Sequence, residues 1–209
     1  MKKTRVLIAD DHAIVRMGLA SLLGTSPLFD VVGEAFDGAD AVRQALALHP
    51  DVVVMDISMP RQDGIAATAE LHKSMPDVKV LLLTTFNSSE SIAQGLRAGA
   101  LGAALKNTDN DELLRAVQAT AEGRRTITAE VERLLADDPP LPDLSPRQVE
   151  ILESIARGLT NREIAVQLAI SLESVKSHVK IVLGKLGAAS RTEAASIALR
   201  KRLLKPAAG

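Results

Sequence analysis

Two apolar stretches near the start of the chain each end at carboxylates. The run Val6–Ala9 is followed directly by Asp10 and Asp11. A second run, Val52–Met55, is followed by Asp56. If both runs are strands of one parallel sheet, their carboxyl ends open onto the same edge, where ligands of open α/β folds bind. Carboxylates gathered there repel one another and shift each other's pKa, so the arrangement favours a bound cation or a covalent modification.

Two further apolar runs are followed by side chains that donate hydrogen bonds. Leu81–Leu83 is followed by Thr84 and Thr85, and Leu101–Leu105 is followed by Lys106. Carboxylates at this density favour a hard divalent cation such as Mg²⁺. A carboxylate held beside the metal can attack a phosphoryl donor and form an acyl phosphate. A hydroxyl and an ammonium group would then stabilise the phosphoryl oxygens, so these residue types predict phosphoryl-transfer chemistry.

The first 122 residues alternate between strand-like and helix-like segments. The alternation predicts an α/β domain with a five-stranded, doubly wound parallel sheet, covered by helices on both faces. The expected strands are Arg5–Ala9, Asp30–Ala35, Asp51–Met55, Val78–Leu83 and Leu101–Leu105. The expected helices are Ala13–Leu23, Gly38–Leu48, Asp63–Ser74, Ser88–Ala98 and Asp109–Glu122.

The remaining residues divide into a linker and a helical domain. Segment 123–143 contains a helix-like stretch, Thr128–Ala136, and then three prolines and three acids, which predict a linker with a short helix. Residues 144–209 show helical periodicity, so a small all-α domain is expected. Asn161 is expected to cap its second helix, and a tight turn before the third makes a helix-turn-helix candidate. The expected helices are Pro146–Ala156, Asn161–Leu168, Leu172–Leu186 and Thr192–Arg202.

Composition limits the class of protein. A chain of 209 residues suits two domains of about 100 residues each. The absence of cysteine excludes disulfides and thiolate metal sites. The apolar run that follows the basic start is far too short for a signal peptide or a membrane span, which favours a soluble, cytoplasmic protein that does not act at a membrane.

Charge is distributed unevenly along the chain. Residues 1–122 carry 11 Lys and Arg against 16 Asp and Glu, whereas residues 144–209 carry 11 against 5. The basic second domain favours a polyanionic partner, with solvated surface charge as the alternative. The chain has no Trp or Tyr, and its three Phe lie in the first domain. The basic domain therefore lacks the aromatic platform on which single-stranded nucleic acids stack.

Residues 1–122 resemble the receiver domain of two-component response regulators of the NarL/FixJ type, which implies a flavodoxin-like order of the five expected strands. The resemblance is carried by Asp11–Leu19 and by Gly95–Gly102 ahead of Lys106. It implies that a cognate histidine kinase phosphorylates Asp56, and that the domain is no enzyme beyond catalysing its own phosphorylation and dephosphorylation. By the same resemblance, Mg²⁺ is held by Asp10, Asp11, Asp56 and the backbone carbonyl of Ser58, while Thr84 and Lys106 contact the phosphoryl group.

The chain departs from the receiver pattern near Lys106. The position three residues earlier usually carries an aromatic side chain that switches with the hydroxyl residue, and here it is Ala103. The residue after Lys106, often proline, is Asn107. Phe86, two residues beyond Thr84, could replace the missing aromatic or could simply pack at the end of a strand.

Residues 144–202 resemble the LuxR-type helix-turn-helix module. The resemblance is carried by Leu144–Arg147, Ile155–Ala165 and Val175–Val179. It implies binding to double-stranded promoter DNA, with residues 172–186 as the recognition helix.

The pattern of that helix agrees with DNA binding. Lys176, Ser177 and Lys180 share one helical face and are expected to reach base edges in the major groove. One helix-turn-helix makes few base contacts, so a homodimer on paired half-sites is expected when the protein is phosphorylated. The residues expected to contact phosphates are Lys185, Asn161 and Arg162.

Together these features predict a DNA-binding response regulator that a histidine kinase phosphorylates at Asp56 and that regulates transcription. One alternative is a DNA-binding regulator that acts without phosphorylation and uses its receiver only for dimerisation; Ala103 keeps this alternative open. A less favoured alternative is an aspartyl-phosphate phosphohydrolase. Members of that class of enzyme carry an Asp-X-Asp pattern that begins at the nucleophile. In this chain, the residue two positions beyond Asp56 is Ser58.

Overall fold

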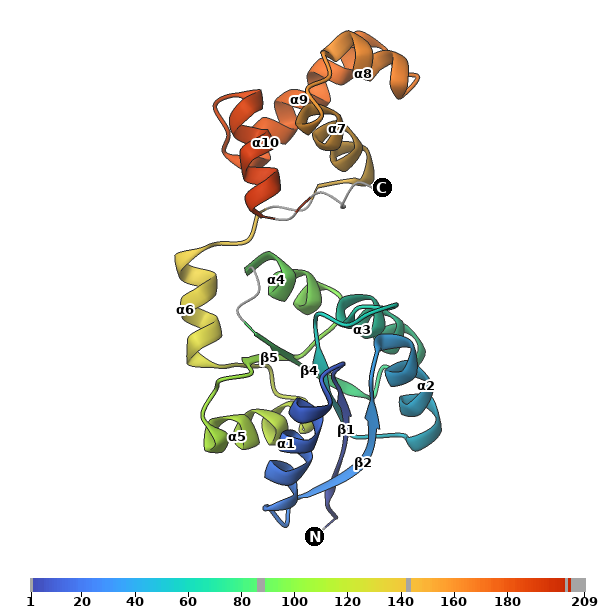
Figure 1. The fold of residues 1–209 in the computed structure, drawn as a ribbon, viewed down its shortest axis with the longest axis vertical. Helices are drawn as coiled ribbons and strands as arrows, with labels where there is room; N and C mark the ends of the chain where they lie inside the picture. The colour runs from blue at the N-terminus through green and yellow to red at the C-terminus, as the bar shows by residue number, and fades with distance from the viewer. Residues whose placement is uncertain (1, 86–88, 142–143, 202, 204–209) are drawn as a thin grey trace. The chain divides into compact units, whose positions relative to one another are not determined.

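The computed structural model describes residues 2–85, 89–141, 144–201 and 203. The chain forms two compact units, Met1–Pro140 and Leu141–Gly209 (Figure 1). Each unit has its own buried apolar clusters, so each has the core that an independent domain needs.

The first unit is built on a parallel sheet with the strand order β2-β1-β3-β4-β5-β6. Five of its strands were predicted. In the described part of the chain there is a sixth, β6, which is two residues long and pairs with β5 at Gly102 and Ala103. The strands are β1 (Thr4–Ala9), β2 (Phe29–Ala35), β3 (Val52–Asp56), β4 (Lys79–Thr84), β5 (Gly102–Leu105) and β6 (Thr126–Ile127).

Helices cover both faces of this sheet (Figure 1). Successive strand residues point to opposite faces, so Val53 and Met55 join one core while Val52 and Val54 join the other. Burial on both faces explains why the strands are almost continuously apolar. The predicted doubly wound α/β class is confirmed. One face carries α1 (Ala13–Gly24) and α5 (Asn110–Ala121), and the other carries α2 (Gly38–Leu48), α3 (Gly64–Ser74), α4 (Ser89–Arg97) and α6 (Ala129–Asp137).

Helix α6 belongs to the first unit. Its residue Val131 is fully buried in the same apolar cluster as Ala103 of β5, and Leu134 and Leu135 pack against that cluster. The backbone N–H of Thr128, which precedes α6, donates a 3.1 Å hydrogen bond to the carbonyl of Ala103. The segment expected as a linker, 123–143, therefore contributes a strand and a packed helix to the first unit as far as Pro140.

The second unit is a bundle of short helices. Its buried residues, among them Ile151, Ile164, Val175 and Val182, come from α7, α8 and α9, and α10 adds Ala194. The helices are α7 (Pro146–Ala156), α8 (Asn161–Gln167), α9 (Leu172–Leu186) and α10 (Arg191–Arg200). The predicted all-α domain is present, and each expected helix is found within two residues of its predicted bounds where those are described.

The cap of α8 differs from the prediction. Thr160 is the N-cap, and its hydroxyl accepts a hydrogen bond from the backbone N–H of Glu163. The carboxylate of Glu163 in turn accepts from the backbone N–H of Thr160, at 2.6 Å. This reciprocal capping box uses both residues, so Asn161 becomes the first residue of the helix rather than its cap.

Among the described residues, the structure contains no helix long and apolar enough to span a bilayer.

Candidate functional site: a carboxylate cluster and a basic helix face

The register of the sheet brings the predicted site residues of the first unit to one edge. Ala9 lies opposite Met55, so Asp10 and Asp56 follow side by side. Thr84 lies opposite Leu105, the residue before Lys106. The parallel strand order therefore gathers these side chains from four different strands at the carboxyl end of the sheet.

Lys106 lies between two buried carboxylates. Its Nζ is 2.6 Å from Oδ2 of Asp10 and 3.0 Å from Oδ2 of Asp56. Asp10 is 1% exposed and Asp56 is 3% exposed. One ammonium group thus faces two carboxylates in a region that water hardly reaches, where the uncompensated negative charge is costly.

Burial and charge shift the pKa values of this group. Burial raises the pKa of Asp56, the hydrogen bond and charge of Lys106 lower it in part, and the charge of Asp10 raises it again, so the net shift is upward. Burial alone would lower the pKa of Lys106, but hydrogen bonds and charges from Asp10 and Asp56 raise it further, so its net shift is also upward. Lys106 therefore stays a cation under all ordinary conditions.

Asp11 and His12 complete the cluster on its solvent side. His12 Nδ1 lies 2.7 Å from Oδ1 of Asp11 and 3.3 Å from Oδ1 of Asp10. Asp10, Asp11, His12 and Asp56 each offer a ligand atom, and these atoms lie within 4.8 Å of one another. Three carboxylates around one point are the oxygen donors that Mg²⁺ prefers, so the residues present fit that ion. Ser58 also lies at the cluster, because its backbone forms a hydrogen bond to Asp56.

Thr84 is fully buried at the end of β4. Its hydroxyl donates a 3.0 Å hydrogen bond to the carbonyl of Thr85, whose own side chain is exposed. Burial at the sheet edge, shared with Asp56, favours Thr84 over Thr85 as the hydroxyl residue of the cluster. Phe86, considered as a substitute for the missing aromatic, lies outside the described residues.

The loop after β3 is held tightly against the strand that carries Asp56. The backbone N–H of Gly64 donates to the carbonyl of Ile57 at 2.9 Å. A Cβ at position 64 would lie 2.0 Å from the carbonyl oxygen of Asp56, a distance that no side chain could occupy. Glycine is therefore required at this position, eight residues beyond Asp56.

Sequence reasoning missed Arg61, which joins this loop to the start of α2. Its guanidinium pairs with the carboxylate of Asp37 and lies over the ring of Phe36, 5.1 Å from the ring centre. Asp37 also caps α2 by accepting from the backbone N–H of Asp40, at 2.6 Å. That backbone hydrogen bond, together with Arg61, keeps the pKa of Asp37 below its ordinary value. The positive φ of 64° at Arg61 leaves no signal in the sequence.

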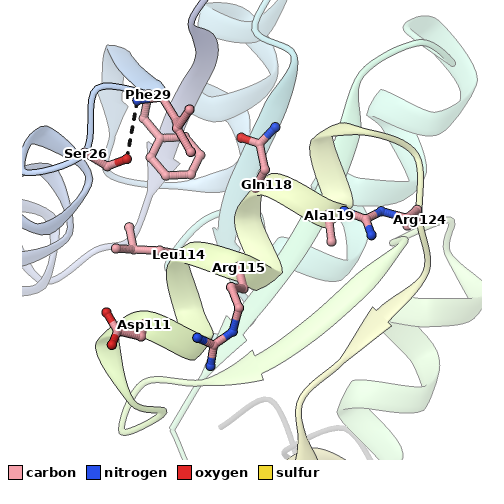
Figure 2. Close-up of a pocket in the computed structure, with 9 residues that line it drawn as sticks. Ser26, Phe29, Asp111, Leu114, Arg115, Gln118, Ala119 and Arg124 are labelled. Carbon is pink, nitrogen blue, oxygen red and sulfur yellow. Dashed lines mark hydrogen bonds between the residues drawn. The ribbon is translucent and has the colours of Figure 1, made fainter.

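A surface hollow of about 470 Å³ lies elsewhere on the first unit. Figure 2 shows Leu114 and Gln118 of α5 beside Ser26, which precedes β2, and Phe29, the first residue of β2. None of the predicted site residues is among its described lining residues. The hollow is therefore separate from the carboxylate cluster.

The second unit presents a basic face on α9. Lys176, Ser177 and Lys180 are all exposed, whereas Val175 and Val179 on the other side of the helix are buried. Lys176 Nζ lies 3.1 Å from the carboxylate of Glu173, a pair in which both side chains are more than half exposed. Such a pair contributes little to stability, so Lys176 is available to a stronger anionic partner.

The three residues expected to contact phosphates are placed differently from one another. Arg162 is exposed on α8. Lys185 donates a 3.0 Å hydrogen bond to Oε1 of Gln148 on α7, and Asn161 accepts a hydrogen bond from Arg191 of α10. Lys185 and Asn161 thus hold helices of the second unit together. Contacts between separate helices leave no trace in the spacing of residues along one helix.

Two families match the chain. The response regulator receiver domain matches residues 6–118, and the luxR family of bacterial regulatory proteins matches residues 142–198. Together these matches cover the sheet unit with its carboxylate cluster and the helical unit with its basic face.

Relatives match over the whole chain. The transcriptional regulatory protein LiaR of Bacillus subtilis is 39% identical over 208 residues, covering 96% of this chain and 99% of LiaR. The crystal structure of the response regulator ChrA, from a heme-sensing two-component system, has a TM-score of 0.59 and 40% identity, covering 98% of this chain and 100% of ChrA. The structure of the response regulator RcsB in complex with DNA has a TM-score of 0.69 and 28% identity, covering 96% of this chain and 99% of that chain. The chain therefore belongs to the two-component response regulators, with an N-terminal receiver domain and a C-terminal domain of the luxR family.

Proposed function

We propose that this response regulator accepts a phosphoryl group on Asp56 from a cognate histidine kinase in the cytoplasm and then binds promoter DNA through α9. The observation that carries the proposal is the contact of Lys106 with both Asp10 and Asp56 at the carboxyl edge of the sheet. The exposed basic face of α9 in the same chain supplies the surface for DNA.

The cluster can support phosphoryl transfer from a phosphohistidine. A carboxylate oxygen of Asp56 bonds to phosphorus while the bond from phosphorus to the histidine nitrogen of the kinase breaks, and that nitrogen leaves with the electron pair. Lys106, already beside Asp56, pairs with a phosphoryl oxygen, and the hydroxyl of Thr84 donates to another. Mg²⁺ held by Asp10, Asp11, Asp56 and the backbone carbonyl of Ser58 would neutralise part of the negative charge on the phosphoryl group.

The receiver domain catalyses only its own phosphorylation and dephosphorylation. Hydrolysis of the acyl phosphate at Asp56 returns the receiver to its starting state, and no small phosphate ester is turned over. A phosphohydrolase would need an acid to protonate the leaving group, and the residue two beyond Asp56 is Ser58. Ser58 does not supply that proton at neutral pH, which supports the receiver role over the hydrolase alternative.

The DNA-binding half of the proposal is supported by similarity and by charge. Related solved structures include RcsB dimers bound to DNA, at 28% identity to this chain. In this chain Lys176 and Lys180 lie on one exposed face with Ser177, at spacings that place them along one groove. We infer that the phosphorylated protein binds as a homodimer to paired half-sites in promoter DNA.

At position 103, where receivers usually carry an aromatic residue, the small side chain of alanine affects how α6 packs. Ala103 is fully buried in the cluster to which Val131 of α6 belongs. The small side chain thus leaves room for α6 to pack on β5. We infer that α6 relays the state of the receiver toward the second unit, a role that regulation by phosphorylation requires and that a receiver used only for dimerisation does not.

The phosphoacceptor can be tested with a matched pair of variants. Asp56→Asn should abolish the mass increase of one phosphoryl group that acetyl phosphate and Mg²⁺ produce in the wild-type chain. Asp77→Asn, on an exposed residue away from the cluster, should be phosphorylated at the wild-type rate. An Asp56→Asn chain that still carries an acid-labile phosphoryl group would show that another residue is the acceptor.

A further inference from the structure

Two large apolar side chains of α9 are exposed: Leu172, 36% exposed at the first position of the helix, and Ile181 in its second half. Ile181 is 45% exposed. It follows Lys180 directly and lies one turn beyond Ser177, so it borders the basic face. It belongs to neither of the buried clusters that the described residues of the second unit form. An exposed β-branched residue on a face otherwise built for water or anions calls for a partner with an apolar group.

The surface of α9 beyond Ile181 has no protruding side chain at Gly184. Gly184 is one turn further along α9, and a Cβ placed there would have no described atom within 4 Å. A partner that lies along the helix can therefore approach the backbone closely at Gly184 while it contacts Ile181. Lys176 and Lys180 on the same face, against the single carboxylate of Glu173, favour a partner that is anionic overall.

Double-stranded DNA meets both conditions. Its backbone is anionic, and the C5-methyl group of thymine is an apolar group on the base edges of the major groove. Aliphatic side chains that contact this methyl group discriminate thymine from the other bases. We propose that Ile181 contacts a thymine methyl group and so specifies an A·T pair in each half-site, next to the bases that Lys176, Ser177 and Lys180 contact. This inference rests on the proposed DNA binding through α9.

The test removes a single methyl group from the DNA. A high-affinity duplex is first selected by the full-length, phosphorylated chain from a randomised library. Each thymine of the selected half-site is then replaced by deoxyuridine, which lacks only the C5-methyl group. Dissociation constants are measured for the wild-type chain, for Ile181→Ala and for Val166→Ala, a control at an 83% exposed aliphatic residue of α8.

At one thymine per half-site, the deoxyuridine duplex should bind the wild-type chain and Val166→Ala about fourfold more weakly, as expected for one buried methyl group. Ile181→Ala should bind the two duplexes equally, because it has already lost its contact with the methyl group. The non-additivity of the two changes identifies the pair in contact.

Three outcomes would contradict the inference, and they are distinguishable. If every deoxyuridine substitution weakens wild type and Ile181→Ala by the same factor, Ile181 does not contact a thymine methyl group. If Ile181→Ala changes the oligomeric state in sedimentation and shows no methyl coupling, the residue belongs to a protein interface. If the wild-type chain selects no duplex at all, the proposed DNA binding itself is wrong.

Discussion

The hydroxyl of Ser89 donates a 2.9 Å hydrogen bond to the carboxylate of Asp138, so the first residue of α4 is tied to the residue that follows α6. Ser89 is fully buried. In the chain, α4 follows the segment after Thr84, and α6 ends close to the boundary between the two units. This contact therefore ties the start of α4 to the part of the chain that leads into the second unit.

Removing this hydrogen bond should weaken the coupling between the two units more than the chemistry of the cluster. We expect Ser89→Ala to lower the free energy of unfolding of the first unit by about 1 kcal/mol. Phosphorylation by acetyl phosphate should proceed at the wild-type rate, whereas the ratio of DNA affinities with and without phosphorylation should fall. Ser74→Ala, which removes an exposed hydroxyl contact at the end of α3, is the matched control for both measurements. An unchanged affinity ratio in Ser89→Ala would exclude a role for this contact in signalling.

The packing of α6 on the sheet predicts where the receiver can be cut. A fragment of residues 1–140 keeps β6 and α6, whereas a fragment of residues 1–122 leaves β5 as an open edge and uncovers the apolar surface beneath Val131. We expect the longer fragment to unfold cooperatively and at a higher temperature in circular dichroism. Val131→Ala in the longer fragment should lower the free energy of unfolding by about 2 kcal/mol. Equal melting temperatures for the two fragments would show that α6 contributes nothing to the domain.

The raised pKa of Asp56 predicts that its charge opposes folding. Burial is the main cause, and it means that the folded state binds the Asp56 proton more tightly than the unfolded state does. Stability of the wild-type chain should therefore fall, relative to Asp56→Asn, as pH rises from the ordinary value of 3.8 through the raised pKa, and the difference should then stay constant. This difference in the free energy of unfolding between the two chains grows by about 1.4 kcal/mol for each unit by which the pKa of Asp56 is raised. Urea unfolding of both chains without Mg²⁺ measures this difference at each pH. A wild-type chain that gains stability relative to Asp56→Asn as pH rises would contradict the prediction.

Arg61 allows backbone strain to be separated from side-chain contacts. Its ion pair with Asp37 and its contact with Phe36 are partly solvated, since 59% of the Arg61 side chain is exposed. We expect Arg61→Ala to cost about 1 kcal/mol, because the contacts are lost while the left-handed backbone conformation remains. Arg61→Gly should be more stable than Arg61→Ala by about 0.5 to 1 kcal/mol, because glycine adopts a positive φ without strain. Urea unfolding of the three chains gives the order, and an alanine variant more stable than the glycine variant would contradict it.

The contacts of Arg162 and Lys185 predict different roles on DNA. Arg162 is exposed and expected to contact one phosphate. Arg162→Ala should therefore reduce the magnitude of the slope of log affinity against log salt concentration by about one. Lys185 is bonded to Gln148, so Lys185→Ala should leave that slope nearly unchanged and instead lower the stability of the second unit. Binding measured by fluorescence anisotropy across a range of salt concentrations separates the two effects. Equal changes of slope in both variants would mean that Lys185 leaves Gln148 when DNA binds.

The fold and the carboxylate edge could be predicted because both depend on short-range pattern. Apolar runs bounded by helical segments determine the strands, and a parallel sheet necessarily gathers their carboxyl ends. Asp10, Asp56 and Lys106 were therefore placed together from the sequence, and the structure brings them within hydrogen-bonding distance. The exposed basic face of α9 followed in the same way from helical spacing.

What could not be predicted depends on contacts between distant segments. Strand β6 has only two residues, too few to show a period. A helix was expected at Thr128–Ala136 and is found at Ala129–Asp137, but its packing on β5 depends on the space that Ala103 leaves, which becomes visible only when the two segments meet. The contacts of Lys185 with Gln148 and of Asn161 with Arg191 likewise join different helices. Arg61 escaped notice because a single arginine in a loop does not indicate its backbone conformation.

The contact between Gly64 and Asp56 limits how a phosphoryl group could act on the rest of the molecule. The carbonyl of Asp56 fills the space that any side chain at position 64 would need, so a substitution of Gly64 would have to displace the main chain of Asp56. We infer that new charge placed on Asp56 is accommodated by neighbouring side chains rather than by this closely packed main chain. The flexible side chain of Lys106 and the hydroxyl of Thr84 are such neighbours. On this view, the covalent state of Asp56 would reach the rest of the molecule through the rearrangement of side chains at the end of the sheet.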